Sequence, residues 1–95
     1  MAEISVLLPS VLAPLAGGRS GLEVPADGPL PVGRLLDELA GNYPALGRRL
    51  RDETGSVRRF VNVYVSGVEI RRLQGLGTEV SPGQEVLIIQ SVAGG

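Results

Sequence analysis

The 95-residue sequence contains no cysteine, no histidine and no lysine. Without cysteine there is no disulfide and no thiolate nucleophile, and without histidine there is no imidazole base. The common zinc ligand sets draw on the same side chains and are excluded with them. The absence of lysine means that no ε-amine of this chain can accept an isopeptide bond. Any acyl transfer would therefore have to run outward from the protein, and we expect no catalytic residue and no metal site.

An excess of positive charge and long apolar runs are lacking too. Nine arginines against ten acidic residues give a formal net charge of -1, which leaves no basic excess to neutralise a phosphate backbone. No apolar run approaches the roughly 20 residues that span a bilayer, and the first residues show no signal peptide pattern. We expect a single-domain cytoplasmic protein that binds neither nucleic acid nor membrane.

The first half of the sequence predicts a β-hairpin followed by a helix. Residues 3–8 and 21–24 alternate apolar and polar side chains, and a loop rich in proline and glycine separates them. The next apolar residues follow helical spacing and predict one buried stripe, formed by Val32, Leu35, Leu36, Leu39 and Tyr43. We expect Pro31 to be the first helical residue and Gly41 with Asn42 to end the helix in a left-handed conformation. Residues 46–50 predict a second, short helical turn.

The second half predicts mainly strands. Residues 59–65 are dense in β-branched and aromatic side chains, as expected of a central strand, and residues 68–70 predict a short edge strand. Residues 73–80 predict a loop or a tight helical turn. Residues 85–92 predict a last strand buried on both sides, with apolar residues at Val86, Leu87, Ile88 and Ile89. One helix packed across a mixed sheet of four or five strands is an α+β, β-grasp arrangement.

The chain closes on Val92, Ala93, Gly94 and Gly95, which we interpret as a tail anchored by the last strand. We place the β-grasp domain at residues 1–92 and a flexible tail at residues 93–95. Glycines have no Cβ and can thread a channel too narrow for side chains. The terminal α-carboxylate, with an ordinary pKa of about 3.3–3.7, is anionic and a poor electrophile near neutral pH. A partner enzyme could activate it by adenylation with ATP, after which a nucleophile displaces the acyl-adenylate.

Four sequence features together resemble the sulfur carrier proteins of the ubiquitin-like β-grasp superfamily. They are RFVNVYV at residues 59–65, GLGTEVSPGQEV at 75–86, NYP at 42–44 and the terminal VAGG. The resemblance is to the CysO type in particular, with the MoaD and ThiS types as more distant relatives. In one respect the sequence departs from the pattern, since such carriers often have one or two prolines before the tail, where this chain has Gln90 and Ser91.

The resemblance implies that Gly95 is adenylated by an enzyme of the ubiquitin-activating type and converted to a thiocarboxylate, with sulfur delivered by a rhodanese-like domain. It implies a sulfur-accepting synthase downstream and, in the CysO type, a metalloprotease that frees the product. The carrier itself would bind no cofactor, because ATP is used by the activating partner. The product could be cysteine, a thiosugar or another sulfur-containing metabolite or cofactor. The alternative is a ubiquitin-like modifier conjugated to protein amines, or a non-covalent binding module.

In such carriers the sheet face away from the helix docks on the activating enzyme. Strand parity assigns this face to Leu7, Leu87 and Ile89, with Phe60 and Tyr64 as candidate neighbours. The competing interpretation is that Leu87 and Ile89 are simply core residues, because periodicity cannot distinguish the faces of a uniformly apolar strand. The five arginines between residues 48 and 59 are likewise open to two interpretations, a solvated loop or a docking patch.

Overall fold

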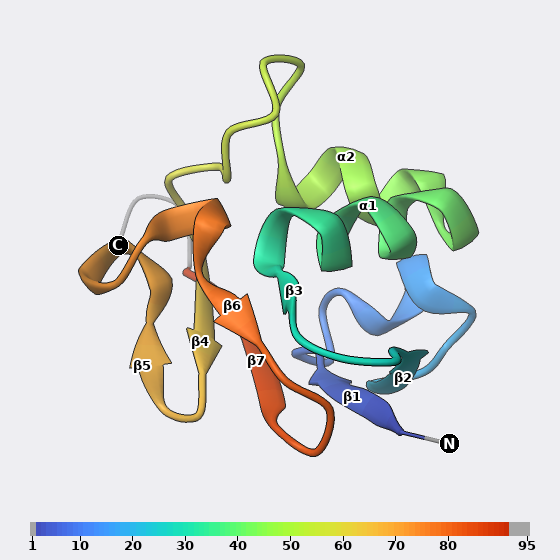
Figure 1. The fold of residues 1–95 in the computed structure, drawn as a ribbon. Coiled ribbons are helices and arrows are strands. Elements are labelled where there is room, and N and C mark those ends of the chain that lie inside the picture. The colour runs from blue at the N-terminus through green and yellow to red at the C-terminus, as the bar shows by residue number, and fades with distance from the viewer. Residues whose placement is uncertain (1, 92–95) are drawn as a thin grey trace.

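A computed structural model of the chain describes residues 2–91 (Figure 1). Val92, Ala93, Gly94 and Gly95, together with the predicted boundary between residues 92 and 93, lie outside the described residues.

A mixed five-stranded sheet forms one layer of the structure. Its order is β2 (Gly21–Pro25), β1 (Glu3–Leu7), β7 (Glu85–Gln90), β4 (Val61–Val65) and β5 (Val68–Glu69). β7 lies in the centre, parallel to β1 and antiparallel to β4. The predicted hairpin of β1 with β2 is confirmed. A two-residue turn joins β4 to β5, and both Ser66 and Gly67 have positive φ (50° and 87°), as the twist of a tight hairpin requires.

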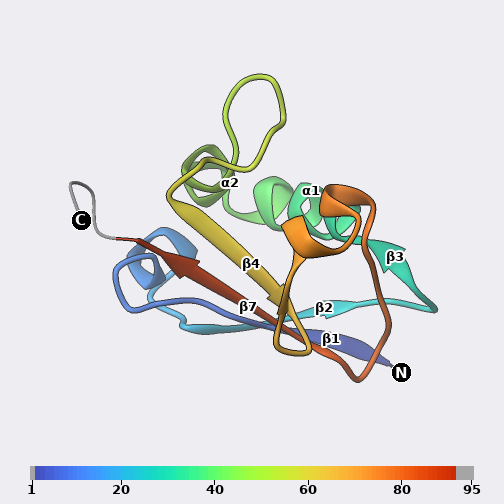
Figure 2. The ribbon, with the colours of Figure 1, turned by 90° about the vertical axis from the view of Figure 1, so that its left-hand side faces the viewer.

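Two helices cover one face of this sheet, where the sequence predicted one main helix and a short helical turn. α1 (Val32–Asn42) buries its apolar stripe, and α2 (Pro44–Leu50) follows after a single residue (Figures 1 and 2). Each buried aliphatic side chain of that stripe contributes roughly 1.5–3 kcal/mol. The buried α1 side chains are Val32, Leu35, Leu36 and Leu39.

The predicted ends of α1 were wrong. Pro31 precedes the helix with extended backbone (φ -66°, ψ 147°) and pairs in a strand. At the other end Asn42 is still helical, and the helix ends at Tyr43 with φ -135° and ψ 83°, so no left-handed residue terminates it. The cause is Pro44, whose ring disfavours the helical conformation of the residue before it. Pro44 itself suits the first turn of α2, because the backbone amide hydrogen that proline lacks would have no intrahelical acceptor there.

A second, two-stranded sheet was not predicted. β3 (Leu30–Pro31) pairs antiparallel with β6 (Glu79–Val80), and a hydrogen bond of 2.8 Å from the Val32 amide to the Thr78 carbonyl extends the contact. This pairing ties the start of α1 to the segment before β7. The described residues also include three 3-10 turns, at Ala13–Ala16, Ile70–Arg72 and Gly75–Gly77.

Close packing between the two helices depends on Gly47. A Cβ added at Gly47 would lie 2.9 Å from the Cα of Ala40 and closer still to its Cβ. We therefore expect Gly47→Ala to lower the free energy of unfolding by about 1–3 kcal/mol, because the helices would have to separate. Gly41→Ala is the matched control, since a Cβ there meets no atom within 4 Å. It should be neutral or stabilising by up to about 1 kcal/mol. Urea denaturation of both variants measures the difference, and equal stabilities would contradict the packing argument.

Candidate functional site

The end of β7 is held by β4. β1 pairs with β7 only at residues 85–87, whereas β4 pairs with it as far as Gln90. Just beyond the strand the Ser91 amide donates a hydrogen bond of 2.7 Å to the Phe60 carbonyl. β7 ends at Gln90, so the prediction of a strand reaching residue 92 was too long within the described residues. Ser91 has an amide that a proline in its place would lack. The chain therefore leaves the sheet from a fixed point at Ser91.

The sheet face opposite the helices carries an apolar group beside this point. Leu87 is the register partner of Leu7 on one side and of Tyr64 on the other, and Ile89 follows two residues later. Leu7 is 37 % exposed and Ile89 is 40 % exposed, while Leu87 is half-buried. The prediction that β7 is buried on both sides was therefore wrong. The buried side chains of β7, Val86 and Ile88, face the helices, and Leu87 and Ile89 face away.

Tyr64 and Phe60 are placed differently. Tyr64 lies next to Leu87 and is half-buried, so it belongs to the apolar group on the outer face. Phe60 packs against the buried core and lines a hollow with Leu15 and Ala45 on the helix side. The prediction of Phe60 as an outer-face neighbour was wrong, because Phe60 precedes β4 and the alternation of the strand does not fix its direction. We call Leu7, Tyr64, Leu87 and Ile89 the outer apolar patch.

Acidic side chains occupy the other end of the same sheet face. Ser5 is the register partner of both Glu23 and Glu85, and Glu3 lies two residues before it on β1. All three glutamates are exposed. The outer face is thus apolar toward the end of β7 and acidic toward its start. A partner that approaches the end of β7 meets the apolar part first.

On the helix side, the loop between α2 and β4 is more ordered than a solvated charge run. The Asp52 carboxylate accepts hydrogen bonds from the Thr54 hydroxyl and from the Thr54 and Ser56 amides. The Arg58 amide and its Nε donate to the carbonyls of Leu50 (3.0 Å) and Arg48 (2.9 Å). These bonds fasten the segment before β4 to the C-terminal end of α2.

The hydrogen bonds of this loop lead to a prediction about the pKa of Asp52. The Thr54 hydroxyl, joined by the two amides and by the charge of Arg58, holds the pKa of Asp52 below its ordinary value. The ionised Asp52 carboxylate therefore stabilises the fold at pH values above its ordinary pKa. This stabilisation is lost as the pH falls through the lowered pKa of Asp52. We expect Thr54→Ala to raise this pKa, as seen in a carbon-13 NMR titration. Ser56→Ala should leave it nearly unchanged, because the Ser56 amide remains. Equal pKa values in wild type and Thr54→Ala would refute the assignment.

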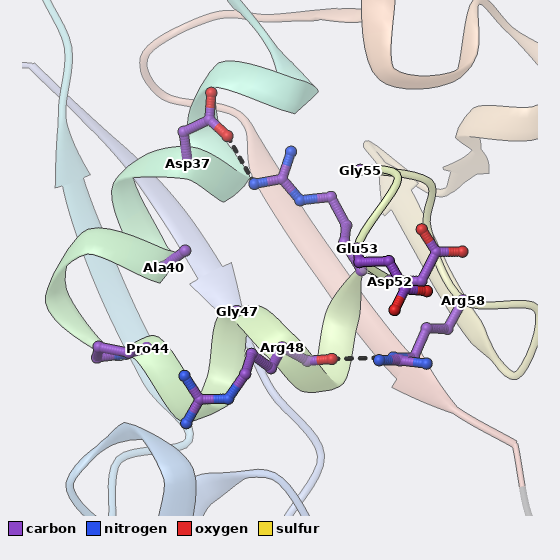
Figure 3. Close-up of a pocket in the computed structure, with 10 residues that line it drawn as sticks. Asp37, Ala40, Pro44, Gly47, Arg48, Asp52, Glu53, Gly55 and Arg58 are labelled. Atoms are coloured by element: carbon purple, nitrogen blue, oxygen red, sulfur yellow. Dashed lines mark hydrogen bonds and ion pairs between the residues drawn. The ribbon is translucent and has the colours of Figure 1, made fainter.

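A second hollow lies between α1, α2 and this loop (Figure 3). Its walls carry charges of both signs, and Arg51 bridges it by an ion pair of 2.6 Å with Asp37 on α1. No group of three or more side chains suited to a metal ion occurs within residues 2–91. No helix in the same part of the chain is long and apolar enough to cross a membrane. The hollow therefore offers charged contacts but no metal site among the described residues.

The five-stranded sheet covered by two helices is the β-grasp fold of ubiquitin-like proteins. Residues 6–95 match the ThiS family. The sulfur carrier protein CysO of Mycobacterium tuberculosis is 34% identical over 95 residues, covering 98% of this chain and 99% of the relative. The small archaeal modifier protein 1 of Haloferax volcanii is 34% identical over 84 residues, covering 88% and 91%. The chain belongs to the ThiS family.

Solved structures agree with this assignment. The crystal structure of the Amycolatopsis orientalis BexX/CysO complex contains a similar chain with a TM-score of 0.85 and 30% identity, covering 97% of this chain and 99% of that one. The crystal structure of M. tuberculosis CysO gives a TM-score of 0.81 and 32% identity, covering 94% and 99%. The predicted β-grasp fold and the resemblance to sulfur carriers are therefore confirmed.

Proposed function

We propose that this protein is a sulfur carrier whose reactive group is the terminal carboxylate of Gly95. A carboxylate oxygen attacks the α-phosphate of ATP in an activating enzyme of the ubiquitin-activating type, and pyrophosphate leaves. Hydrosulfide then attacks the acyl carbon and displaces AMP, and loss of one proton from sulfur leaves the thiocarboxylate. The chain is a protein cosubstrate in this scheme, and the catalytic groups belong to its partners.

The observation that carries the proposal is the anchoring of the last strand. β7 is central in the sheet, and the Ser91 amide is fixed to the Phe60 carbonyl at 2.7 Å. Residues 92–95 therefore start from a defined point, and four extended residues reach about 13–14 Å from it. Gly94 and Gly95 add no side chain to the cross-section, which suits entry of Val92, Ala93 and both glycines into a narrow active site.

The outer apolar patch is the proposed docking surface for the activating enzyme. Its members are exposed or half-buried beside the end of β7, so a partner that binds them also faces the start of the tail. Exposed apolar groups on a small protein are typical of partner surfaces. The thiocarboxylate would then pass to a sulfur-accepting synthase that makes cysteine, a thiosugar or another sulfur-containing product, with release by a metalloprotease in the CysO-type route.

A second function is favoured by the similarity to a protein named as a modifier. In that case the activated carboxylate would be conjugated to an amine of another protein. ATP–pyrophosphate exchange with a purified activating enzyme tests the step common to both functions. The sulfur carrier then forms a thiocarboxylate when sulfide is added, whereas the modifier forms adducts on lysines of other proteins. If exchange occurs and lysine adducts form but no thiocarboxylate is found, the protein is a modifier and the sulfur carrier proposal is rejected.

A further inference from the structure

Three arginines gather on the helix side, next to the point where the chain leaves the sheet. Arg48 and Arg49 lie on α2, and Arg58 lies in the segment before β4. Together with Leu15, Ala45 and Phe60 they line one hollow. We call Arg48, Arg49 and Arg58 the arginine cluster. In Figure 2, β4 begins beneath α2 and β7 ends near the start of β4, in agreement with the bond from Ser91 to Phe60.

The position of the cluster is fixed by hydrogen bonds. Arg58 donates through its amide to the Leu50 carbonyl and through its Nε to the Arg48 carbonyl, and these bonds join the end of α2 to the segment before β4. Two residues later the Phe60 carbonyl accepts the bond from Ser91. Hydrogen bonds thus connect the backbone that carries the cluster to Ser91, the last described residue before the tail.

The positive charge of the cluster is only partly balanced by nearby acidic residues, since the charge of Arg58 acts on Asp52. Within residues 2–91 the ion pairs are Arg51 with Asp37 and Arg71 with Glu69, and neither includes the cluster. Arg48 and Arg49 are exposed. Figure 3 shows the Arg48 side chain pointing away from Asp37 and from the loop that carries Asp52. Because the net charge of the protein is -1, this concentration of positive charge is local.

We propose that the arginine cluster binds an acidic segment of the protein partner that receives the tail, with an apolar side chain of that segment in the hollow beside Leu15 and Phe60. The charge of the cluster selects an acidic occupant, and the half-buried apolar residues between the arginines give it a point of attachment. This deepens the proposed function, because it adds a second contact on the side of the tail opposite the outer apolar patch. A partner that binds both the arginine cluster and the outer apolar patch would fix the direction in which the tail enters it.

A peptide titration followed by NMR tests the surface without an activating enzyme. The probe is a decamer of glutamate with two central leucines, added to the nitrogen-15-labelled full chain at low salt. We expect shifts in the amides of residues 45–49 and 58–60. The affinity should fall as salt is raised, because exposed charges are screened. A peptide with glutamine in place of glutamate should bind at least about tenfold more weakly, since the charge attraction is gone.

The double variant R48A/R49A should bind the acidic peptide about five- to tenfold more weakly. R34A/R72A is the matched control, because both of these arginines are exposed and lie outside the cluster; it should bind like wild type. Shifts spread over all exposed arginines, or equal losses in the two double variants, would overturn the proposal. Tighter binding of a thymidine decamer than of the acidic peptide would overturn it as well. Failure of ATP–pyrophosphate exchange would refute the carrier function and leave this peptide result standing, so the two failures are distinguishable.

Discussion

Deletion of Gly95 is expected to abolish adenylation while the protein stays folded. Removing one residue withdraws the terminal carboxylate by about 3.3–3.6 Å along an extended chain. A displacement of only about 1 Å from the reacting position can reduce the rate about a hundredfold. We therefore expect kcat/KM for ATP–pyrophosphate exchange to fall at least about a hundredfold.

The thermal unfolding of this deletion variant provides its control. Among residues 2–91 the buried core consists of residues between Ile4 and Ile88, and we expect the midpoint of unfolding to stay unchanged. R72A, which alters an exposed side chain of the turn Ile70–Arg72, should keep full exchange activity. Unfolding of the deletion variant would assign the terminus a structural role, and undiminished exchange would exclude Gly95 as the reactive residue.

Truncation of the outer apolar patch is expected to raise KM with little change in kcat. The double variant L87A/I89A loses contacts that hold the partner equally in the ground state and in the transition state. Loss of such contacts raises KM and leaves kcat unchanged. Central apolar residues of an interface cost about 2–4 kcal/mol when truncated. An increase in KM of about thirty- to several hundredfold follows from that range.

L73A is the matched control for this experiment. Leu73 is 47 % exposed, comparable to Ile89, and lies in the segment between the turns Ile70–Arg72 and Gly75–Gly77, away from the patch. Its variant should have the KM of wild type. Because Leu87 is half-buried, urea denaturation of L87A/I89A must show that it is folded under the assay conditions. A folded double variant with unchanged KM would remove the patch from the proposed docking surface.

Much of the fold could be predicted because the relevant signals are local. Alternation defined β1 and β2, and the stripe from Val32 to Leu39 defined α1. The strand pair β3 with β6 could not be predicted in this way. Each partner has two residues, and the paired residues lie 48 and 50 positions apart in the sequence. Such short pairs exist only when tertiary packing brings them together.

The candidate site was predicted in part, and the errors have specific causes. Parity placed Leu7, Leu87 and Ile89 on one face, where the structure has them. The apolar run at residues 86–89 did not show whether anything covers that face, since both parities are apolar. Phe60 was misassigned because it precedes the strand. The sequence left the five arginines at 48–59 open between a solvated loop and a docking patch. It could not show which of them lie together, because Arg58 comes beside Arg48 only through the hydrogen bonds that close the loop.

Mass spectrometry of the intact protein tests the central claim most directly. The full chain is incubated with an activating enzyme of the ubiquitin-activating type, ATP and sulfide, and the mass is compared with a reaction that lacks ATP. The carrier function predicts an ATP-dependent gain equal to the exchange of one oxygen for one sulfur, located by fragmentation at Gly95 and absent from the Gly95 deletion variant. An adenylated protein that never gains sulfur, or a gain elsewhere in the chain, would contradict it.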